Sequence, residues 1–504
     1  MTIPAEQAAT AAALQALAGV PPLETHISAV FIGADTVYKL RKAVRLPFLD
    51  FTPLAERERT ARRELALNAA AAPGLYRDVV PIRRAENGTL RLDGPGAVVD
   101  WVLRMAPVPA PDFLDRMAAE GRITETLLDQ LADAVAAYHA ALPPLATDPL
   151  PAFDALIEGN VASALSAGLP PAAVAAWQAA ITASRARLAP WLTARRTGGF
   201  VRRIHGDLHL GNLCLWHGKP TPFDALEFDE ALAEFDLGYD LAFLLMDLEA
   251  RLDRAAANRV LNRYLAATGD WSIVTGLPLF LSLRAMVRAH VEQRSGHTAR
   301  AADYLARALA PFAPAEDLAA PIVLGIGGLP GTGKSTLARA LAPRLGPAPG
   351  AVIVRSDEIR KRQHGVAPEQ KLPPDAYTPA ASAAVFAELA AAVRILAAAG
   401  HAVVADATFM APAHRDALAQ AAGTTPCLGI WLHAPLPVLE ARVAARHGDA
   451  SDADVMVLRQ AARHDPGPGQ WCAIDATDGD TARRKVVAAV QDAYVLHADH
   501  HVQS

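Results

Sequence analysis

The sequence predicts a chain of two domains, an α+β domain followed by a parallel α/β domain, and three observations support this prediction. Short alternating apolar runs separated by turn residues occupy 25–105, and apolar residues at helical spacing follow over 113–310. From 320 onward, strand-like and helix-like runs alternate, as they do in βαβ units. A stretch rich in Pro and Ala separates the two patterns. We therefore assign 1–310 to the first domain, 311–319 to a linker, 320–490 to the second domain and 491–504 to a C-terminal tail.

The composition is that of a folded protein without an overall basic charge. Of the 504 residues, 52% are hydrophobic and 20% are charged, which excludes a wholly disordered chain. The formal net charge is −5, so no global basic field attracts nucleic acid or an acidic membrane. Nucleic acid as a partner would therefore depend on a local basic groove. The composition does not bear on the oligomeric state.

Three features of the sequence favour a cytoplasmic location. Cys214, Cys427 and Cys472 are far apart and odd in number, so no disulfide framework is predicted. The N-terminal segment has no basic region and contains Glu6, unlike a secretory signal. No uncharged apolar run reaches the ~18 residues that a membrane span needs, so no membrane association is predicted.

The strongest motif lies at Gly328–Ser335, where the sequence fits GxxxxGK[ST] between an apolar strand and a helix. The glycines of such a loop let backbone N–H groups point at phosphate oxygens, and the helix N-terminus adds partial positive charge. Lys334 would place its ammonium on the β/γ-phosphates, and Ser335 would offer its hydroxyl to Mg²⁺. The residues assigned to the nucleotide here are Gly328, Gly331, Thr332, Gly333, Lys334, Ser335 and Thr336.

Carboxylates follow the next two predicted strands of this domain. Asp357 is expected at the carboxyl edge of the sheet, where it could accept the proton of an acceptor hydroxyl or simply cap the following helix. Asp406 ends the third strand and is placed to hold Mg²⁺ directly or through water. Arg442 and Arg446 are four residues apart and share a helix face, which predicts a lid over the phosphates.

As a set, these motifs resemble the P-loop kinases related to polynucleotide kinase and to the zeta-toxin group. The resemblance covers about 320–490. It implies that Asp357 is the general base, that Arg360 contacts the acceptor and that Arg446 is a lid arginine. Arg415 is expected to be a solvated or salt-bridged helix residue.

A second motif surrounds Asp207, with Asn212 five residues later and Asp224 twelve residues further on. An Asp, an Asn and a second Asp at these distances is the spacing of the kinase catalytic loop and its metal-binding Asp. Asp207 would orient and deprotonate the acceptor hydroxyl, while Asn212 and Asp224 would hold Mg²⁺. Gly206 stands after His205 in place of the Arg of protein kinases, and the region resembles the aminoglycoside phosphotransferase group.

This resemblance implies a bilobal, protein-kinase-like fold in which a strand Lys pairs with a helix Glu and contacts the α/β-phosphates. We prefer Lys39 to Lys42 because Lys39 continues the alternation from Val37. The partner should lie on the helix predicted over about 54–71. Glu64 is the preferred residue because it precedes an apolar pair, and Glu56 and Glu58 are the alternatives.

Several carboxylates follow Asp224, between Glu227 and Asp247. They could form a wall that attracts a cationic acceptor, but helix caps and solvated faces explain them more simply. Asp240 directly precedes an apolar run and is expected to cap a helix.

The sequence thus predicts a fusion of two ATP- and Mg²⁺-dependent phosphotransferases with small-molecule alcohol groups as acceptors. The N-terminal acceptor is expected to be a sugar or amino sugar, and the C-terminal acceptor a small metabolite or a nucleotide or nucleic-acid hydroxyl. Two other hypotheses stay open: a regulatory ATPase in which one site is a switch, and a toxin-like P-loop kinase restrained by its fused partner domain. The Pro- and Ala-rich linker predicts that the two halves fold independently.

Overall fold

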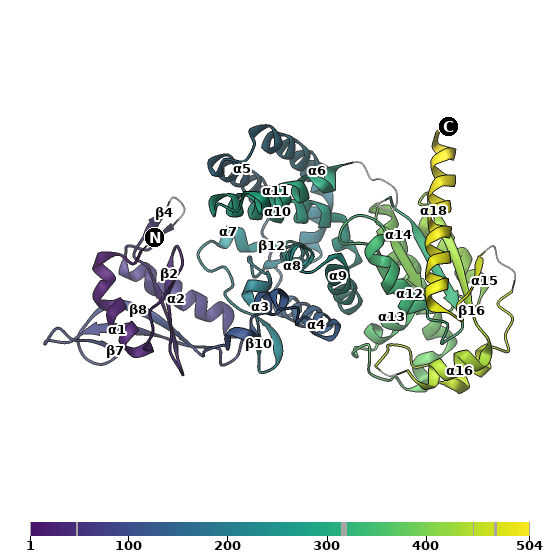
Figure 1. The fold of residues 1–504 in the computed structure, drawn as a ribbon, viewed down its shortest axis with the longest axis horizontal. Coiled ribbons are helices and arrows are strands. Elements are labelled where there is room, and N and C mark those ends of the chain that lie inside the picture. The colour runs from purple at the N-terminus through teal and green to yellow at the C-terminus, as the bar shows by residue number, and fades with distance from the viewer. Residues whose placement is uncertain (1, 47–48, 314–319, 447, 468–470, 503–504) are drawn as a thin grey trace. The chain divides into compact units, whose positions relative to one another are not determined.

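The computed structural model describes residues 2–46, 49–313, 320–446, 448–467 and 471–502, and for 231–232 and 495–502 it describes the backbone alone. The chain divides into two compact units. The first contains Met1–Leu156 and Trp191–Leu244, and the second contains Ile157–Pro190 and Leu245–Ser504. Figure 1 shows the ribbon of both.

The first unit is built around an antiparallel sheet, because the alternating runs of 25–105 pair with one another. Strands β2 (Ser28–Ile32), β3 (Val37–Arg41), β8 (Ala97–Met105) and β6 (Tyr76–Arg84) form its centre. The two edge strands are β1 (Leu23–Glu24) and β7 (Leu90–Leu92). Helix α2 (Leu54–Asn68) packs against β8 and β6, which brings its buried residue Glu64 to the sheet.

The rest of the first unit is mainly helical, with short strands around the predicted catalytic loop. These elements are η1 (Ala5–Gln7), α1 (Ala8–Ala18), β4 (Arg45–Leu46), β5 (Leu49–Asp50), η2 (Ala110–Asp112), α3 (Leu114–Ala119), α4 (Glu125–Ala141), β9 (Val201–Arg203), η3 (Leu210–Asn212), β10 (Leu213–Trp216), β11 (Lys219–Pro222), α7 (Glu230–Ala233) and β12 (Glu234–Asp236). Helices α5 (Pro149–Ala167), α6 (Pro171–Thr197) and α8 (Leu237–Arg251) each contribute residues to both units.

The second unit contains a parallel sheet of strands in the order β14-β15-β13-β16-β17. Since all these strands run in one direction, their carboxyl ends meet at one edge. The strands are β13 (Val323–Gly328), β14 (Val352–Arg355), β15 (Val403–Asp406), β16 (Cys427–His433) and β17 (Cys472–Asp475). The helices around them are α12 (Lys334–Leu341), η7 (Ala342–Arg344), α13 (Ser356–Gln363), η8 (Pro374–Tyr377), α14 (Pro379–Ala398), α15 (Pro412–Ala422), α16 (Leu436–Ala444), α17 (Val455–Ala461) and α18 (Gly479–Val502).

The same unit also contains the helices that precede the linker. They are α9 (Arg254–Thr268), η4 (Trp271–Gly276), α10 (Leu277–Arg294), α11 (Thr298–Leu309) and η5 (Ala310–Phe312). Compact packing therefore does not divide the chain at 310, where the change of sequence pattern placed the boundary. Whether the two predicted halves fold separately stays a prediction.

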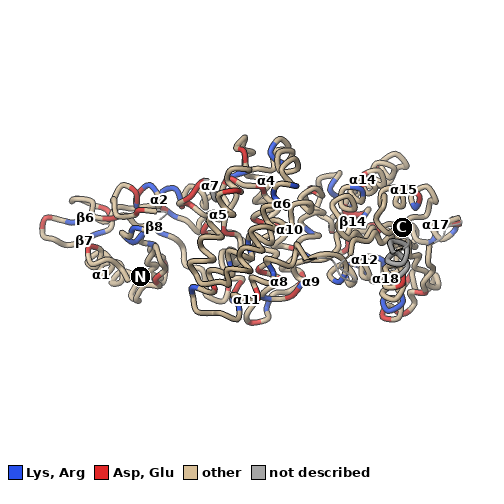
Figure 2. The backbone as a smooth tube through the Cα atoms, turned by 90° about the horizontal axis from the view of Figure 1, so that it is seen from above, with Lys and Arg blue, Asp and Glu red and all other residues tan. Residues whose placement is uncertain are grey.

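The predicted fold class is confirmed, because an α+β part precedes a parallel α/β sheet. Most of the predicted linker, 314–319, lies outside the described residues. The predicted tail begins as helix, because α18 continues to Val502, and 503–504 lie outside the described part of the chain. Basic and acidic residues are interspersed along the backbone (Figure 2).

Two of the described helical segments are long and apolar enough to cross a membrane, by length and composition alone. They are Trp271–Arg294 and Pro379–Ala398. The apolar window of the first is 67% buried within the protein, as in the core helix of a globular unit. The second contacts α13 and α15 of the parallel-sheet region.

A buried histidine of the second unit predicts acid sensitivity. His401 is 2% exposed, its Nε2 lies 3.1 Å from the Gly350 carbonyl oxygen, and burial lowers its pKa to about 4. Because this is below the pKa of an unfolded histidine, protonation favours unfolding as the pH falls from about 6.5 to 4. Denaturant titration should show a lower unfolding free energy at pH 5 than at pH 7, with His401 contributing about 2 kcal/mol of the difference. His290, whose pKa burial also lowers to about 4, adds to it. His401→Gln should therefore reduce the difference by about 2 kcal/mol; an unchanged difference would mean that other groups cause it.

Candidate functional site

An ion-pair network joins the sheet of the first unit to Asp224, the predicted Mg²⁺ ligand. The Lys39 ammonium lies 2.7 Å from a Glu64 oxygen and 2.6 Å from Asp224 Oδ1. Burial alone would lower the pKa of Lys39, but Asp224 and Glu64 raise it above its usual range. The Lys–Glu pair that the sequence predicted is therefore present. The alternative Lys42 instead donates to Glu24 and to the Thr25 carbonyl oxygen.

Arg41 supplies a second cation to this network, two residues from Lys39 on the same strand face. It lies 2.6 Å from the second oxygen of Glu64, and it also pairs with Glu227. Glu227 is 5% exposed, and its burial raises its pKa although Arg41 opposes the shift. A buried carboxylate that is already paired is not an open wall for a cationic acceptor, so the acidic-wall hypothesis is wrong for this residue.

The predicted catalytic loop is held in place by its own side chains. Asn212 Nδ2 donates to the Asp207 carbonyl oxygen at 2.9 Å and to Asp207 Oδ2 at 2.8 Å. The N–H groups of His205 and Gly206 donate to the two carboxylate oxygens of Asp240, at 2.6 and 2.9 Å. Asp240 therefore fixes this loop from helix α8. The sequence predicted a helix cap at this position. The role differs because the loop, which is distant in sequence, presents two N–H groups that need acceptors.

Asp224 occupies a conformation that few residues adopt. Its φ is 62°, its N–H donates to the Tyr76 hydroxyl at 2.9 Å, and its side chain is 40% exposed. Burial opposes ionisation of Asp224, but Lys39 outweighs it and lowers the pKa. Such backbone strain persists where neighbouring contacts fix it, often at functional sites. The structure thus places Asp224 as an ionised carboxylate next to Lys39.

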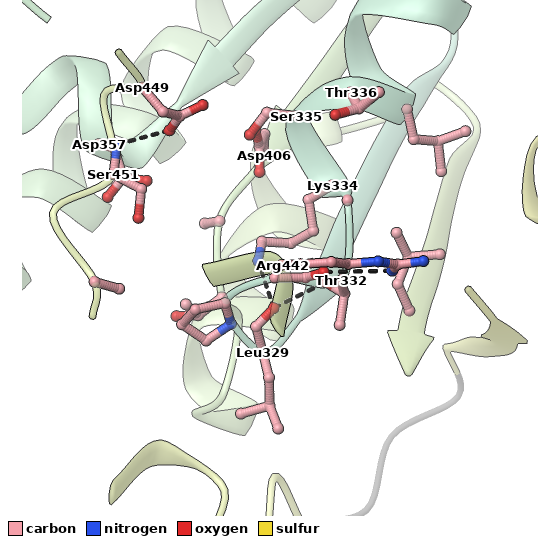
Figure 3. Close-up of a pocket in the computed structure, with 18 of the residues that line it drawn as sticks. Leu329, Thr332, Lys334, Ser335, Thr336, Asp357, Asp406, Arg442, Asp449 and Ser451 are labelled. Atoms are coloured by element: carbon pink, nitrogen blue, oxygen red, sulfur yellow. Dashed lines mark hydrogen bonds between the residues drawn. The ribbon is translucent and has the colours of Figure 1, made fainter. Parts of the chain in front are cut away.

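The GxxxxGK[ST] motif forms the expected loop between β13 and α12. Gly328, Gly331 and Gly333 have φ of 138°, 85° and 86°, a region that favours glycine. A Cβ at Gly331 would lie 2.8 Å from the Leu439 carbonyl oxygen, so α16 packs directly on the loop. Lys334 Nζ donates to the Gly328 and Leu329 carbonyl oxygens at 2.9 and 3.1 Å. The Ser335 hydroxyl donates to Asp406 Oδ2 at 2.6 Å, and Figure 3 shows these two side chains together.

A cavity of about 1240 Å³ opens above this loop. Every residue that the sequence assigned to the C-terminal site except Gly328 lines it. The lining residues among them are Gly331, Thr332, Gly333, Lys334, Ser335, Thr336, Asp357, Arg360, Asp406, Arg442 and Arg446.

Arg355, which the sequence analysis did not single out, pairs with both the predicted base Asp357 and the predicted Mg²⁺ ligand Asp406. It is 4% exposed, and its guanidinium lies 3.4 Å from Asp406, 3.7 Å from Asp357 and 2.6 Å from Asp449. Burial raises the pKa of Asp357, and Arg355 opposes the rise. The sequence signal was an arginine at the end of an otherwise apolar strand, directly before the Ser–Asp pair.

The two predicted lid arginines brace the rim of the cavity through backbone contacts. Arg442 donates to the carbonyl oxygens of Ala476 at 3.0 Å and Thr477 at 2.8 Å, and Arg446 donates to that of Ala453. Their contact with phosphate stays a prediction. Arg415 is 7% exposed and donates to the Phe409 and Pro466 carbonyl oxygens, so the alternative of a solvated residue is wrong.

The residues of both sites fit a nucleotide with Mg²⁺. Mg²⁺ prefers oxygen ligands and usually takes several from water and substrate phosphates. Asp224 and Asn212 offer oxygens in the first unit, and Ser335 and Asp406 offer them in the second. Among the described residues no group of three or more His, Cys, Asp and Glu side chains could hold a metal by itself. A metal at either site would therefore take its remaining ligands from water and phosphate oxygens.

Two segments of the chain match models of known families. Residues 27–277 match the "Phosphotransferase enzyme family" (APH), and residues 323–466 match an "AAA domain" (AAA_33). The chain thus carries an aminoglycoside-phosphotransferase-like kinase domain followed by a P-loop kinase-like domain. Such kinase-type domains support a phosphotransferase, and their families generally use ATP or GTP with Mg²⁺.

Similar proteins exist for most of the chain and for each part. Protein Rv2004c of Mycobacterium tuberculosis (strain H37Rv) is 27% identical over 458 residues, covering 85% of this chain and 87% of that protein. A gluconokinase structure from Sinorhizobium meliloti 1021 is 23% identical with a TM-score of 0.25, and covers 38% of this chain and 99% of its own. The GDP and kanamycin complex of APH(2")-IIia is 14% identical with a TM-score of 0.35, covering 56% and 89%.

Proposed function

We propose that the chain is a two-site, ATP-dependent kinase that phosphorylates alcohol groups of small molecules. One observation supports this above all. Each unit contains a lysine, oxygen-bearing side chains and a further carboxylate, to which the proposal gives the phosphates, Mg²⁺ and the acceptor proton respectively. A site that only bound nucleotide would not need the last of these.

In the first unit Lys39 would hold the phosphates of ATP, and Asn212 and Asp224 would hold the metal. The acceptor oxygen would bond to the γ-phosphorus while the bond from that phosphorus to the β,γ-bridging oxygen breaks, and Asp207 would take the acceptor's proton. A sugar or amino sugar is the proposed acceptor here.

In the second unit the loop of Lys334 and Ser335 would hold ATP, with Asp406 on the metal and Asp357 as the base. Arg355 would allow these two carboxylates to stay ionised near each other, because its charge offsets their mutual repulsion. A small metabolite or a nucleotide hydroxyl is the proposed acceptor, and a cytoplasmic location is part of the proposal.

The test is a metabolite screen with the full chain, Mg-ATP and a coupled assay for ATP consumption, with products identified by mass spectrometry. Repeating each positive reaction with Asp207→Asn and with Lys334→Ala assigns it to one site. Phosphorylated products that disappear with one variant but not with the other are expected. ATP consumption without any phosphorylated product would favour the regulatory ATPase instead.

A further inference from the structure

Strand β14 is the edge of the parallel sheet, so its outer side lacks a neighbouring strand among the described residues. The N–H of Val352 donates inward, to the Ala402 carbonyl oxygen. The N–H of Ile353 therefore points outward, where an unpaired buried N–H would be costly. This strand matters because Asp357 follows its last residue, Arg355, by two positions.

Two asparagines of helix α9 satisfy this edge. Asn262 accepts a hydrogen bond from the Ile353 N–H at 2.6 Å, and its amide group lies 3.3 Å from the Ala351 carbonyl oxygen. Asn258 donates to the same carbonyl oxygen at 3.0 Å and is 2% exposed. The Asn262 amide also donates to Asn258 Oδ1 at 3.0 Å, so the pair acts as one unit.

The contact continues on both sides of β14. Before the strand, Arg254 donates to the Gly346 carbonyl oxygen at 2.6 Å. Gly350 has a φ of 119°, and a Cβ there would lie 2.8 Å from the Asn258 amide, so only glycine permits this approach. After the strand, Arg362 of α13 donates to the Ala266 carbonyl oxygen at 2.8 Å.

The end of α9 fits the Arg362 side chain closely. A Cβ at Gly269 would lie 2.9 Å from Arg362 Nε, and the guanidinium stands over the Trp271 ring at 5.4 Å. Arg263 and Glu369 add an ion pair of 2.7 Å. All these groups belong to one compact unit. Yet α9 lies inside the segment that matches the phosphotransferase family, and β14 lies inside the P-loop segment.

We propose that helix α9 contributes to the catalytic site of the P-loop kinase-like domain. Through Asn258 and Asn262 it holds strand β14 in place, and in this way it positions Asp357. The catalytic half of this inference rests on the proposed function of that site. Asn258 and Asn262 are positioning residues, because they act on the site only through β14. It follows that a fragment starting at the predicted linker would lack helix α9. Strand β14, the sheet edge that precedes Asp357, would then lose the hydrogen bonds that support it.

The test uses the full chain with Asn258→Ala/Asn262→Ala and, as the control, Thr268→Ala on the same helix. Thr268 is exposed; its hydroxyl donates to the Tyr264 carbonyl oxygen within the helix and accepts a hydrogen bond from the Asp270 N–H just after it. In hydrogen–deuterium exchange, peptides over 351–363 should exchange about tenfold faster in the double variant, the factor expected when one hydrogen bond is lost. Peptides of the phosphate loop, 323–336, should be unchanged, as should the Kd for Mg-ATP. Thr268→Ala should change none of these.

Turnover of Mg-ATP at the P-loop site, measured in Asp207→Asn background, should fall about tenfold in the double variant while Mg-ATP affinity stays within a few fold. Faster exchange throughout the unit, or exchange at 351–363 that does not change, would overturn the inference. If the double variant does not fold, hydrogen–deuterium exchange of the wild type tests the inference. The amides of 351–355 should exchange as slowly as those of α9, and faster exchange would contradict the inference. Local exchange that changes as expected in a protein without P-loop turnover would refute the proposed function and leave the support of β14 intact.

Discussion

Replacing Asp207 by Asn should reduce phosphoryl transfer at the first site by about 10²–10⁴, the usual contribution of a positioned general base. Nucleotide binding should be retained, because Lys39, Asn212 and Asp224 are unchanged. The fold of the loop should also be retained. Asn212 donates to the Asp207 side chain at 2.8 Å, and the amide oxygen of an asparagine can accept that hydrogen bond equally well.

The measurement is turnover with an acceptor from the screen, alongside the Kd for Mg-ATP by calorimetry. Glu230→Gln is the matched control, since this carboxylate of the same unit is exposed and pairs with Arg63 and Arg203. Normal turnover in Asp207→Asn would assign this carboxylate to loop structure alone. A loss of ATP affinity equal to the loss of rate would instead make Asp207 part of the nucleotide site.

Local sequence pattern could reveal the residues whose role depends on their neighbours in the chain. The phosphate loop needs closely spaced glycines and a lysine, so a few neighbouring positions reveal its chemistry. Lys39 could be preferred to Lys42 because alternation along a strand decides which face a side chain occupies. The structure agrees, with Lys39 on Glu64 and Lys42 on Glu24.

Residues that act across the fold had no such local signal. Asp240 precedes an apolar helix, which is also the place of a helix cap, and only the three-dimensional structure brings the N–H groups of His205 and Gly206 to it. Arg41 and Glu227 are separated by nearly the whole first unit in sequence. Their pairing explains a buried carboxylate that composition alone made look like part of an acidic surface.

The packing of the helices before the predicted boundary had no local signal either, for a related reason. Pro and Ala near 310–320 mark where the sequence pattern changes from helical to alternating strand and helix, but they do not show which helices pack together. Asn258 and Asn262 lie in an ordinary amphipathic helix, and nothing in their neighbourhood indicates that β14 needs partners. A sheet edge is a property of strand order, which a single sequence does not display.

Lys334→Ala and Asp357→Asn should separate nucleotide binding from chemistry at the second site. Loss of the Lys334 ammonium should weaken Mg-ATP binding and abolish transfer, because its charge acts on the β/γ-phosphates. Asp357 follows a different strand from the phosphate loop, and its side chain is 33% exposed at the cavity. Its replacement should therefore keep ATP affinity within a few fold and reduce transfer by about 10²–10⁴.

Both variants should be measured for Mg-ATP affinity and for phosphoryl transfer, with circular dichroism to check the fold. Lys485→Ala, which removes an exposed lysine of α18, is the control for a general change of charge. The order of the sheet explains why the two effects should differ: the loop follows the central strand β13, whereas Asp357 follows the edge strand β14. If Asp357→Asn transfers phosphate at the normal rate, this site has no base at β14, and a P-loop switch that only hydrolyses ATP becomes the better explanation.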